Sequence, residues 1–262
     1  MAELLIRNSS IGFIKAIIFD KDGTLSNSEE CLLELAKTRI NFSVNQFKEL
    51  KITNIKIWLL RKMLVSIYGY KKHSLSANGS LAIASREQNI ISTATIFTLF
   101  GFDWFKSLSI GQKIFDEVDM FLSNQKNDIK KPRTLISGAF DLLVSLKKNG
   151  VCIALMTNDT QAGIEEFICD NKLEGIFDHL WSVENKPSKP DPKSVIELCR
   201  KMNLQPSECA LISDADTDLR MAKEADIQTI IGFTGGWKNP PNLTEKGFLV
   251  KKLNELKIHL TA

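Results

Sequence analysis

Three short apolar runs, each followed at once by polar residues, restrict the fold of this chain more than any other feature of its sequence. The runs cover residues 16–19, 151–156 and 209–212. Apolar runs of about four to eight residues that end in turn-forming residues are typical of strands buried on both faces, as in a parallel sheet. Residues 229–233 form a further run of this kind. The sequence therefore predicts a parallel sheet whose strands come from distant parts of the chain.

Helical patterns separate most of these predicted strands. Apolar residues recur at helical spacing over residues 139–148, 162–169, 193–202 and 219–224. Gly150 can end the first of these helices, Thr160 can cap the second and Pro192 can open the third. Alternating strands and helices indicate an α/β fold with a Rossmann-like parallel sheet as its core.

The stretch between the first and second predicted strands has a different pattern. Its apolar residues follow a helical period over residues 32–40, 55–68, 81–100 and 114–122. None of this stretch predicts a strand, and polar breaks at residues 69–79 and 126–132 divide the helices. We therefore expect two domains. Residues 1–26 and 132–262 would form the α/β core, and residues 27–131 an inserted all-helical domain.

The overall composition argues against several classes of protein. Among 262 residues, 34 basic and 31 acidic side chains give a net charge of +3, so the charge predicts neither a nucleic-acid nor a membrane partner. The five cysteines form no C-x-x-C pair, which favours reduced thiols over disulfides or a zinc site. The sequence shows no secretory pattern and no long apolar span, so we expect a cytoplasmic protein. It does not predict the oligomeric state.

The polar residues at the ends of the predicted strands are the candidates for chemistry. The first strand is followed by Asp20 and Asp22, the second by Thr157 and the third by Asp214. Lys189 lies in a proline-rich turn between the last two clusters. In open parallel sheets, ligands bind at the carboxyl ends of the strands. We therefore expect these side chains to converge on one crevice.

Converging carboxylates limit what this crevice can bind. Asp214 is followed by Asp216 and Asp218, and several carboxylates in one place repel each other unless a hard cation lies among them. Oxygen ligands without paired histidines favour Mg²⁺ over zinc. A lysine and a hydroxyl at the same place need an anionic partner, and a phosphoryl group matches both. In phosphoryl transfer, one aspartate can act as the nucleophile and a second as the acid/base.

The polar clusters resemble the sequence motifs of the haloacid dehalogenase-like hydrolase superfamily. Its D-x-D-G-T motif after an apolar strand matches residues 17–24, and its strand that ends in Ser or Thr matches residues 153–157. Its lysine followed by P-x-P matches residues 189–192, and its strand followed by D-x-x-x-D matches residues 211–218. The position of the insert is similar to that of the helical cap in the phosphoglycolate phosphatase-like branch.

The resemblance implies a catalytic role for each matching residue. Asp20 would be the nucleophile and would also ligate Mg²⁺. Asp22 would be the acid/base, with its backbone carbonyl on the metal. Thr157 and Lys189 would hold the phosphoryl oxygens, and Lys189 would offset the charge on Asp20.

The resemblance also implies further metal and substrate contacts. Asp214 and Asp218 would be the other residues of the Mg²⁺ site. Gly23, Thr24 and Asn158 would contact the substrate.

Two positions remain open at this stage. The fourth motif usually begins Gly-Asp, whereas here Ser213 precedes Asp214, and Asp216 is an additional acidic residue. Which carboxylate joins Asp214 at the metal is therefore not decided. Lys186 also precedes a proline and is a rival for Lys189, although the P-x-P that follows favours Lys189.

The expected function is Mg²⁺-dependent hydrolysis of a small phosphorylated metabolite through an aspartyl-phosphate intermediate. A sugar phosphomutase of the same family is an alternative, because it uses the same groups beneath a cap that excludes water. A non-catalytic, phosphate-binding regulatory protein is a second alternative, which the presence of Asp20, Asp22, Lys189 and Asp214 disfavours. The substrate is expected to depend on the insert, where the sequence is least informative.

Overall fold

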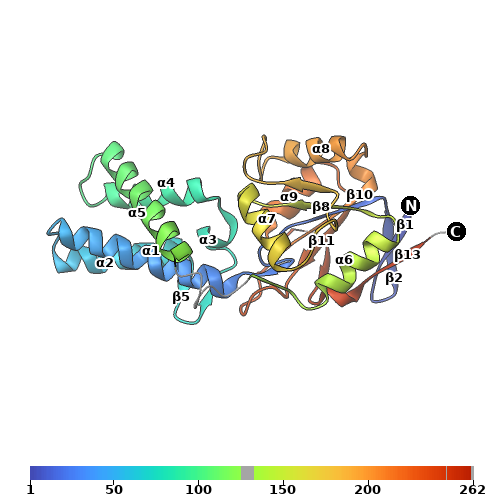
Figure 1. Ribbon diagram of the computed structural model, residues 1–262, viewed down its shortest axis with the longest axis horizontal. Coiled ribbons are helices and arrows are strands. Elements are labelled where there is room, and N and C mark those ends of the chain that lie inside the picture. The colour runs from blue at the N-terminus through green and yellow to red at the C-terminus, as the bar shows by residue number, and fades with distance from the viewer. Residues whose placement is uncertain (125–132, 246, 261–262) are drawn as a thin grey trace. The chain divides into compact units, whose positions relative to one another are not determined.

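The computed structural model describes residues 1–124, 133–245 and 247–260 (Figure 1). The chain divides into two compact units, one formed by Met1–Ser28 with Arg133–Ala262 and the other by Glu29–Pro132. The predicted polar break at residues 126–132 lies outside the described residues. Every residue considered above for a site belongs to the first unit.

A six-stranded parallel sheet forms the centre of the first unit, with the strand order β12-β11-β10-β3-β8-β9. Its strands are β3 (Ala16–Phe19), β8 (Cys152–Met156), β9 (His179–Trp181), β10 (Cys209–Ser213), β11 (Thr229–Phe233) and β12 (Phe248–Val250). The predicted strands are confirmed as β3, β8, β10 and β11. The two edge strands, β9 and β12, have three residues each and are too short for an apolar run to indicate them.

Helices cover both faces of this sheet, and the strand side chains alternate between two hydrophobic cores. On one face, Ile17 and Phe19 belong to the same core as α6 (Ala139–Lys148) and α7 (Gln161–Asp170). On the other face, Ala16 and Ile18 share a core with α8 (Pro192–Lys201) and α9 (Asp216–Glu224). Because both faces are covered, all residues of β3 are buried, which explains its unbroken apolar run. The α/β fold class is thereby confirmed.

A second sheet, which the sequence does not predict, joins the two ends of the chain. It contains β1 (Ala2–Ile6), β2 (Ser9–Ile14) and β13 (Leu256–Leu260), in the antiparallel order β13-β1-β2. The hairpin between β1 and β2 turns at Arg7 and Asn8, which both have positive φ. Two-residue turns of this type are usually recognised by Asn-Gly or Asp-Gly, and Arg-Asn lacks that signal.

Over residues 29–124, the second unit is helical except for one short hairpin. Its helices are α1 (Glu29–Glu49), α2 (Asn54–Ile67), α3 (Ser80–Ile83), α4 (Arg86–Thr98) and α5 (Trp104–Asn124). Strands β5 (Tyr70–Lys71) and β6 (Ser74–Leu75) pair within the predicted polar break and correct the expectation of an all-helical insert. A strand of two residues is too short to show a period-two pattern. In the described parts of the chain, no helix is both long and apolar enough to cross a bilayer.

Candidate active site

The register of the parallel sheet brings three loops to one edge. Phe19, the last residue of β3, lies opposite Ile212 of β10 on one side and Leu155 of β8 on the other. The backbone N–H of Asp20 continues the pairing by donating to the carbonyl of Ile212 at 3.0 Å. The loops after β3, β8 and β10 therefore begin at the same edge, as the sequence predicts.

Lys189 connects the loop after β3 with the first turn of α9. Its Nζ lies 2.7 Å from Oδ1 of Asp20 and 2.6 Å from Oδ2 of Asp218. It also donates to the carbonyl of Met156 at 3.2 Å. The lysine side chain is only 4% exposed, so its charge is matched by these carboxylates rather than by water. Lys186, in contrast, is exposed and donates to a nearby backbone carbonyl. Of the two lysines, Lys189 is the one at the strand ends.

The buried carboxylates at this edge raise one another's pKa values. Burial raises the pKa of Asp20, and the charges of Asp218 and Asp22 add to this rise against the opposing charge of Lys189. Burial also raises the pKa of Asp214 well above its usual range, and the charges of Asp20 and Asp218 act in the same direction. The pKa of Lys189 is raised as well, because Asp20 and Asp218 outweigh the effect of its burial. The edge holds more negative charge than Lys189 neutralises.

Both carboxylate oxygens of Asp214 accept hydrogen bonds from the protein. Oγ1 of Thr24 donates to Oδ1 at 2.9 Å, and the indole Nε1 of Trp237 donates to Oδ2 at 2.5 Å. The backbone N–H of Asp214 donates to Oγ1 of Thr24 at 3.1 Å. Thr24, for which the resemblance implies a substrate contact, is fully buried. Its hydroxyl joins the loop after β3 to the loop after β10.

Trp237 reaches Asp214 because two glycines leave room for its indole. Gly23 has a φ of +82°, and a Cβ at this position would lie 2.4 Å from Nε1 of Trp237. A Cβ on Gly236 would lie 1.8 Å from the carbonyl oxygen of Gly23. Gly23, for which the resemblance also implies a substrate contact, is buried at this close approach of the two loops. Sequence reasoning missed Trp237, and the consecutive glycines before it are the only signal of a close backbone approach.

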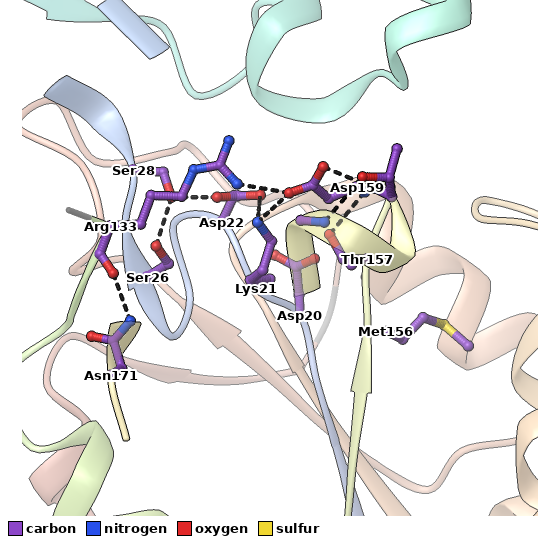
Figure 2. Close-up of polar contacts among 12 residues, drawn as sticks. Asp20, Lys21, Asp22, Ser26, Ser28, Arg133, Met156, Thr157, Asp159 and Asn171 are labelled. Atoms are coloured by element: carbon purple, nitrogen blue, oxygen red, sulfur yellow. Dashed lines mark hydrogen bonds and ion pairs between the residues drawn. The ribbon is translucent and has the colours of Figure 1, made fainter. Parts of the chain in front are cut away.

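Asp22 is held by its own loop and, through Lys21, by the loop after β8 (Figure 2). Its Oδ1 accepts a hydrogen bond from the hydroxyl of Ser28, and its Oδ2 lies 2.9 Å from Nζ of Lys21. The same Nζ donates to Oδ2 of Asp159 at 2.6 Å, and Nη1 of Arg133 donates to that oxygen at 2.7 Å. Burial alone raises the pKa of Asp22, but the positive charges of Lys21 and Arg133 outweigh burial and lower it.

The loop after β8 contains the predicted Thr157 and Asn158. Thr157 is buried, and its Oγ1 accepts a hydrogen bond from the backbone N–H of Asp159 at 3.1 Å (Figure 2). Asn158 is half-buried beside it. Sequence reasoning missed Asp159, because a polar residue just before the helix-capping Thr160 reads as an ordinary loop residue.

The loop after β10 and the start of α9 place their carboxylates differently. Oδ2 of Asp218 accepts a hydrogen bond from Oγ of Ser213 at 2.8 Å, in addition to its ion pair with the buried lysine. Asp216 instead accepts hydrogen bonds from the backbone N–H groups of Thr244 and Glu245, at 2.9 and 3.1 Å. The serine that replaces the usual glycine thus supports Asp218, and Asp216 is engaged with a different loop.

The donor chemistry of this edge fits a hard cation. Oδ1 of Asp20 accepts from Lys189, whereas its Oδ2 accepts no hydrogen bond from the described residues. The neighbouring Asp214 is a buried carboxylate with a raised pKa, and a cation bound beside it would lower that pKa again. Oxygen donors of this kind suit Mg²⁺. Within the described ranges, no three acidic, histidine or cysteine side chains already form a metal cluster. The residues therefore fit Mg²⁺ by their chemistry and not as a preformed cage.

The fold and the site together define a class of hydrolase. A parallel α/β sheet carries an aspartate after its central strand, a buried lysine on that aspartate and further carboxylates after the neighbouring strand. A model of the haloacid dehalogenase-like hydrolase family matches residues 14–226, and the chain belongs to this family.

Individual relatives and a solved structure agree with this assignment. The chain is 24% identical to a phosphoglycolate phosphatase of Colwellia psychrerythraea, over 94% of this chain and 96% of that protein. It is 27% identical to an uncharacterized hydrolase of Saccharomyces cerevisiae, but that match covers 36% of this chain and less than half, 44%, of the relative. The crystal structure of a predicted phosphoglycolate phosphatase from Haemophilus somnus has a similar fold, with a TM-score of 0.62 at 18% identity. The superposed region covers 93% of this chain and 96% of that chain.

Proposed function

We propose that this protein is a Mg²⁺-dependent phosphatase that hydrolyses a small phosphorylated metabolite through an aspartyl-phosphate on Asp20. The placement of Asp20 carries the proposal. It follows the central strand of the sheet, and one of its oxygens is held by Lys189 at 2.7 Å. Its other oxygen accepts no hydrogen bond from the described residues. A carboxylate with one fixed oxygen and one available oxygen is suited to attack phosphorus.

The proposed reaction has two halves. Asp20 attacks phosphorus, the bond to the leaving oxygen breaks, and Asp22 gives a proton to that oxygen. Asp22 then takes a proton from water, the water attacks the aspartyl-phosphate, and phosphate leaves with Asp20 restored. Lys189 holds Asp20 in place and offsets negative charge on the phosphoryl oxygens. Thr157 and Asn158, at the end of β8, are the proposed phosphoryl-binding residues.

Asp20, Asp214 and the backbone carbonyl of Asp22 would hold the magnesium ion. Bound there, the ion would neutralise charge on the phosphoryl oxygens. We assign Asp218 a different part from the one that the resemblance implies. Its Oδ2 contacts Ser213 and Lys189, so we propose that it positions the lysine.

The named relatives suggest a first substrate, and the free cysteines suggest a compartment. Phosphoglycolate, which the name of the Colwellia psychrerythraea relative specifies, is the first substrate to test. The protein would act in the cytoplasm, since all five cysteines are free.

Phosphate release from a panel of phosphorylated metabolites, with Mg²⁺ and with EDTA, tests the proposal. The panel contains 2-phosphoglycolate and several sugar phosphates. We expect release to require Mg²⁺ and to fall by more than about 10³-fold in Asp20→Asn, because the amide cannot act as the nucleophile. Asp170→Asn is the matched control, since Asp170 is exposed at the end of α7 and should leave turnover unchanged.

Undiminished turnover by Asp20→Asn would contradict the proposed nucleophile. Conversion of a sugar phosphate to its isomer without phosphate release would identify a phosphomutase instead. Binding without any turnover would identify a regulatory protein.

A further inference from the structure

Lys21, the residue between the two aspartates of the loop after β3, is completely buried. Its side chain is 0% exposed and its Nζ lies between two carboxylates, 2.9 Å from Oδ2 of Asp22 and 2.6 Å from Oδ2 of Asp159 (Figure 2). A buried ammonium costs several kcal/mol unless it is well paired. The reaction proposed above does not use this lysine, so the presence of a buried charge here needs a separate explanation.

Asp159 is built into its place by several contacts. Its Oδ2 also accepts from Nη1 of Arg133 at 2.7 Å, and its Oδ1 accepts from the backbone N–H of Thr160 at 2.8 Å. Gly163, in the first turn of α7, leaves room for the carboxylate, because a Cβ there would lie 2.5 Å from Oδ2 of Asp159. Lys21 and Arg133 thus face the carboxylates of Asp22 and Asp159, so two positive and two negative side chains meet in this cluster.

Asp22 is the one residue of this cluster to which the proposed reaction gives a role. One oxygen of Asp22 accepts from Ser28 in its own loop, and the other meets Lys21. The direction of this carboxylate therefore depends on where the ammonium of Lys21 lies. The ammonium in turn is held by Asp159, from the loop after β8. A contact between two strand-end loops thus controls the orientation of the proposed acid/base.

We propose that Lys21 and Asp159 are positioning residues that orient the carboxylate of Asp22 for proton transfer, with Asp159 acting through Lys21. The inference rests on the proposed function, and in particular on the role given to Asp22.

The dependence of the rate on the leaving group separates this role from structural support alone. p-Nitrophenolate leaves phosphorus without protonation, whereas the more basic phenolate depends on a general acid. The ratio kcat/KM reports the steps up to phosphoryl transfer to Asp20. We expect Asp159→Asn to lower kcat/KM about 10- to 100-fold for phenyl phosphate, and less than about 3-fold for p-nitrophenyl phosphate.

Further variants test the same chain of contacts. Gly163→Ala displaces the carboxylate of Asp159 without removing a charge, so it should cause the same selective loss. The double variant of Lys21→Met with Asp159→Asn should be no worse than Lys21→Met alone, because Asp159 acts through Lys21. Asp178→Asn is the matched control. It removes a carboxylate that pairs with Lys147 in the last turn of α6 and accepts from the backbone N–H of Ile153 in β8, and it should change neither substrate's kcat/KM.

The outcomes separate the inference from the proposed function. Equal losses on both substrates, or no loss on either, would overturn the inference while the activity of the unmodified enzyme upholds the proposed function. Additive effects in the double variant would overturn the route through Lys21. An unmodified enzyme that releases phosphate from neither the aryl phosphates nor any metabolite of the panel would remove the proposed function, and the inference with it. Circular dichroism establishes that each variant is folded, and if Lys21→Met does not fold, Asp159→Asn and Gly163→Ala decide.

Discussion

The carboxylate of Asp214 is oriented by single hydrogen bonds from two other residues, which prepares it to bind a cation. Thr24 and Trp237 each donate to one of its oxygens, and the side chain is therefore fixed in a buried position. A carboxylate oxygen has a second lone pair, so these hydrogen bonds orient Asp214 without preventing it from meeting a cation. Groups that orient a metal ligand in this way commonly matter for affinity.

A Trp237→Phe substitution tests whether the indole N–H prepares Asp214 to bind a cation. The substitution removes the indole N–H and keeps most of the ring that packs on Gly23. We expect the affinity for Mg²⁺, measured by calorimetric titration without substrate, to fall about 10-fold or more. Trp58→Phe is the control, since that indole is 61% exposed in the second unit. Equal Mg²⁺ affinity in Trp237→Phe and the unmodified protein would rule out a role for the indole in the metal site.

The loop after β11 packs with its backbone directly on the backbone of the loop after β3. Gly236→Ala would place a Cβ 1.8 Å from the carbonyl oxygen of Gly23, so one of the two loops must move. We expect this strain to lower the free energy of unfolding by about 1–3 kcal/mol, measured by urea denaturation, and to lower kcat by displacing Asp20.

Gly111→Ala provides the comparison. Gly111 lies in α5, where the nearest atom to an added Cβ is 3.6 Å away, and alanine favours a helix. Stability should therefore be kept or improved in Gly111→Ala, and kcat should not change. A Gly236→Ala protein that behaves in the same way would show that the loops are not held in contact.

The sheet of β1, β2 and β13 joins the two ends of the chain to the core of the first unit. Leu4 lies on the central strand β1 and is fully buried in that core. We expect Leu4→Ala to lower the free energy of unfolding by about 2–5 kcal/mol, through lost burial and the cavity that remains. The kcat of the folded protein should not change, since Leu4 lies on the three-stranded sheet and not on the parallel sheet whose strand ends carry the site.

Phe13→Ala is the control for Leu4→Ala, because Phe13 lies on β2 and is 49% exposed. It should change the urea midpoint much less. Equal effects of the two substitutions would mean that the terminal sheet does not stabilise the core.

The sequence by itself determined the elements whose signal is local. Strands β3, β8, β10 and β11 are buried on both faces, so their apolar runs are unbroken and easily recognised. Helix α6 shows its period and its glycine end within a dozen residues. The strand-end positions of Asp20, Thr157 and Asp214 follow from the same runs, because polar residues begin where burial stops. The family motifs at these positions pointed to a hydrolase, and the family model confirms this.

Only the tertiary structure decided which of these polar residues meet. Lys21, Asp159 and Trp237 lie far apart in the chain, and each is placed by packing between loops that no local period describes. The hydrogen bond from the buried Thr24 to Asp214 also depends on two loops from distant parts of the chain. The pairing of β1 with β13 likewise joins opposite ends of the chain. Local sequence encodes burial and backbone preference, whereas contacts between distant residues depend on how the whole chain packs.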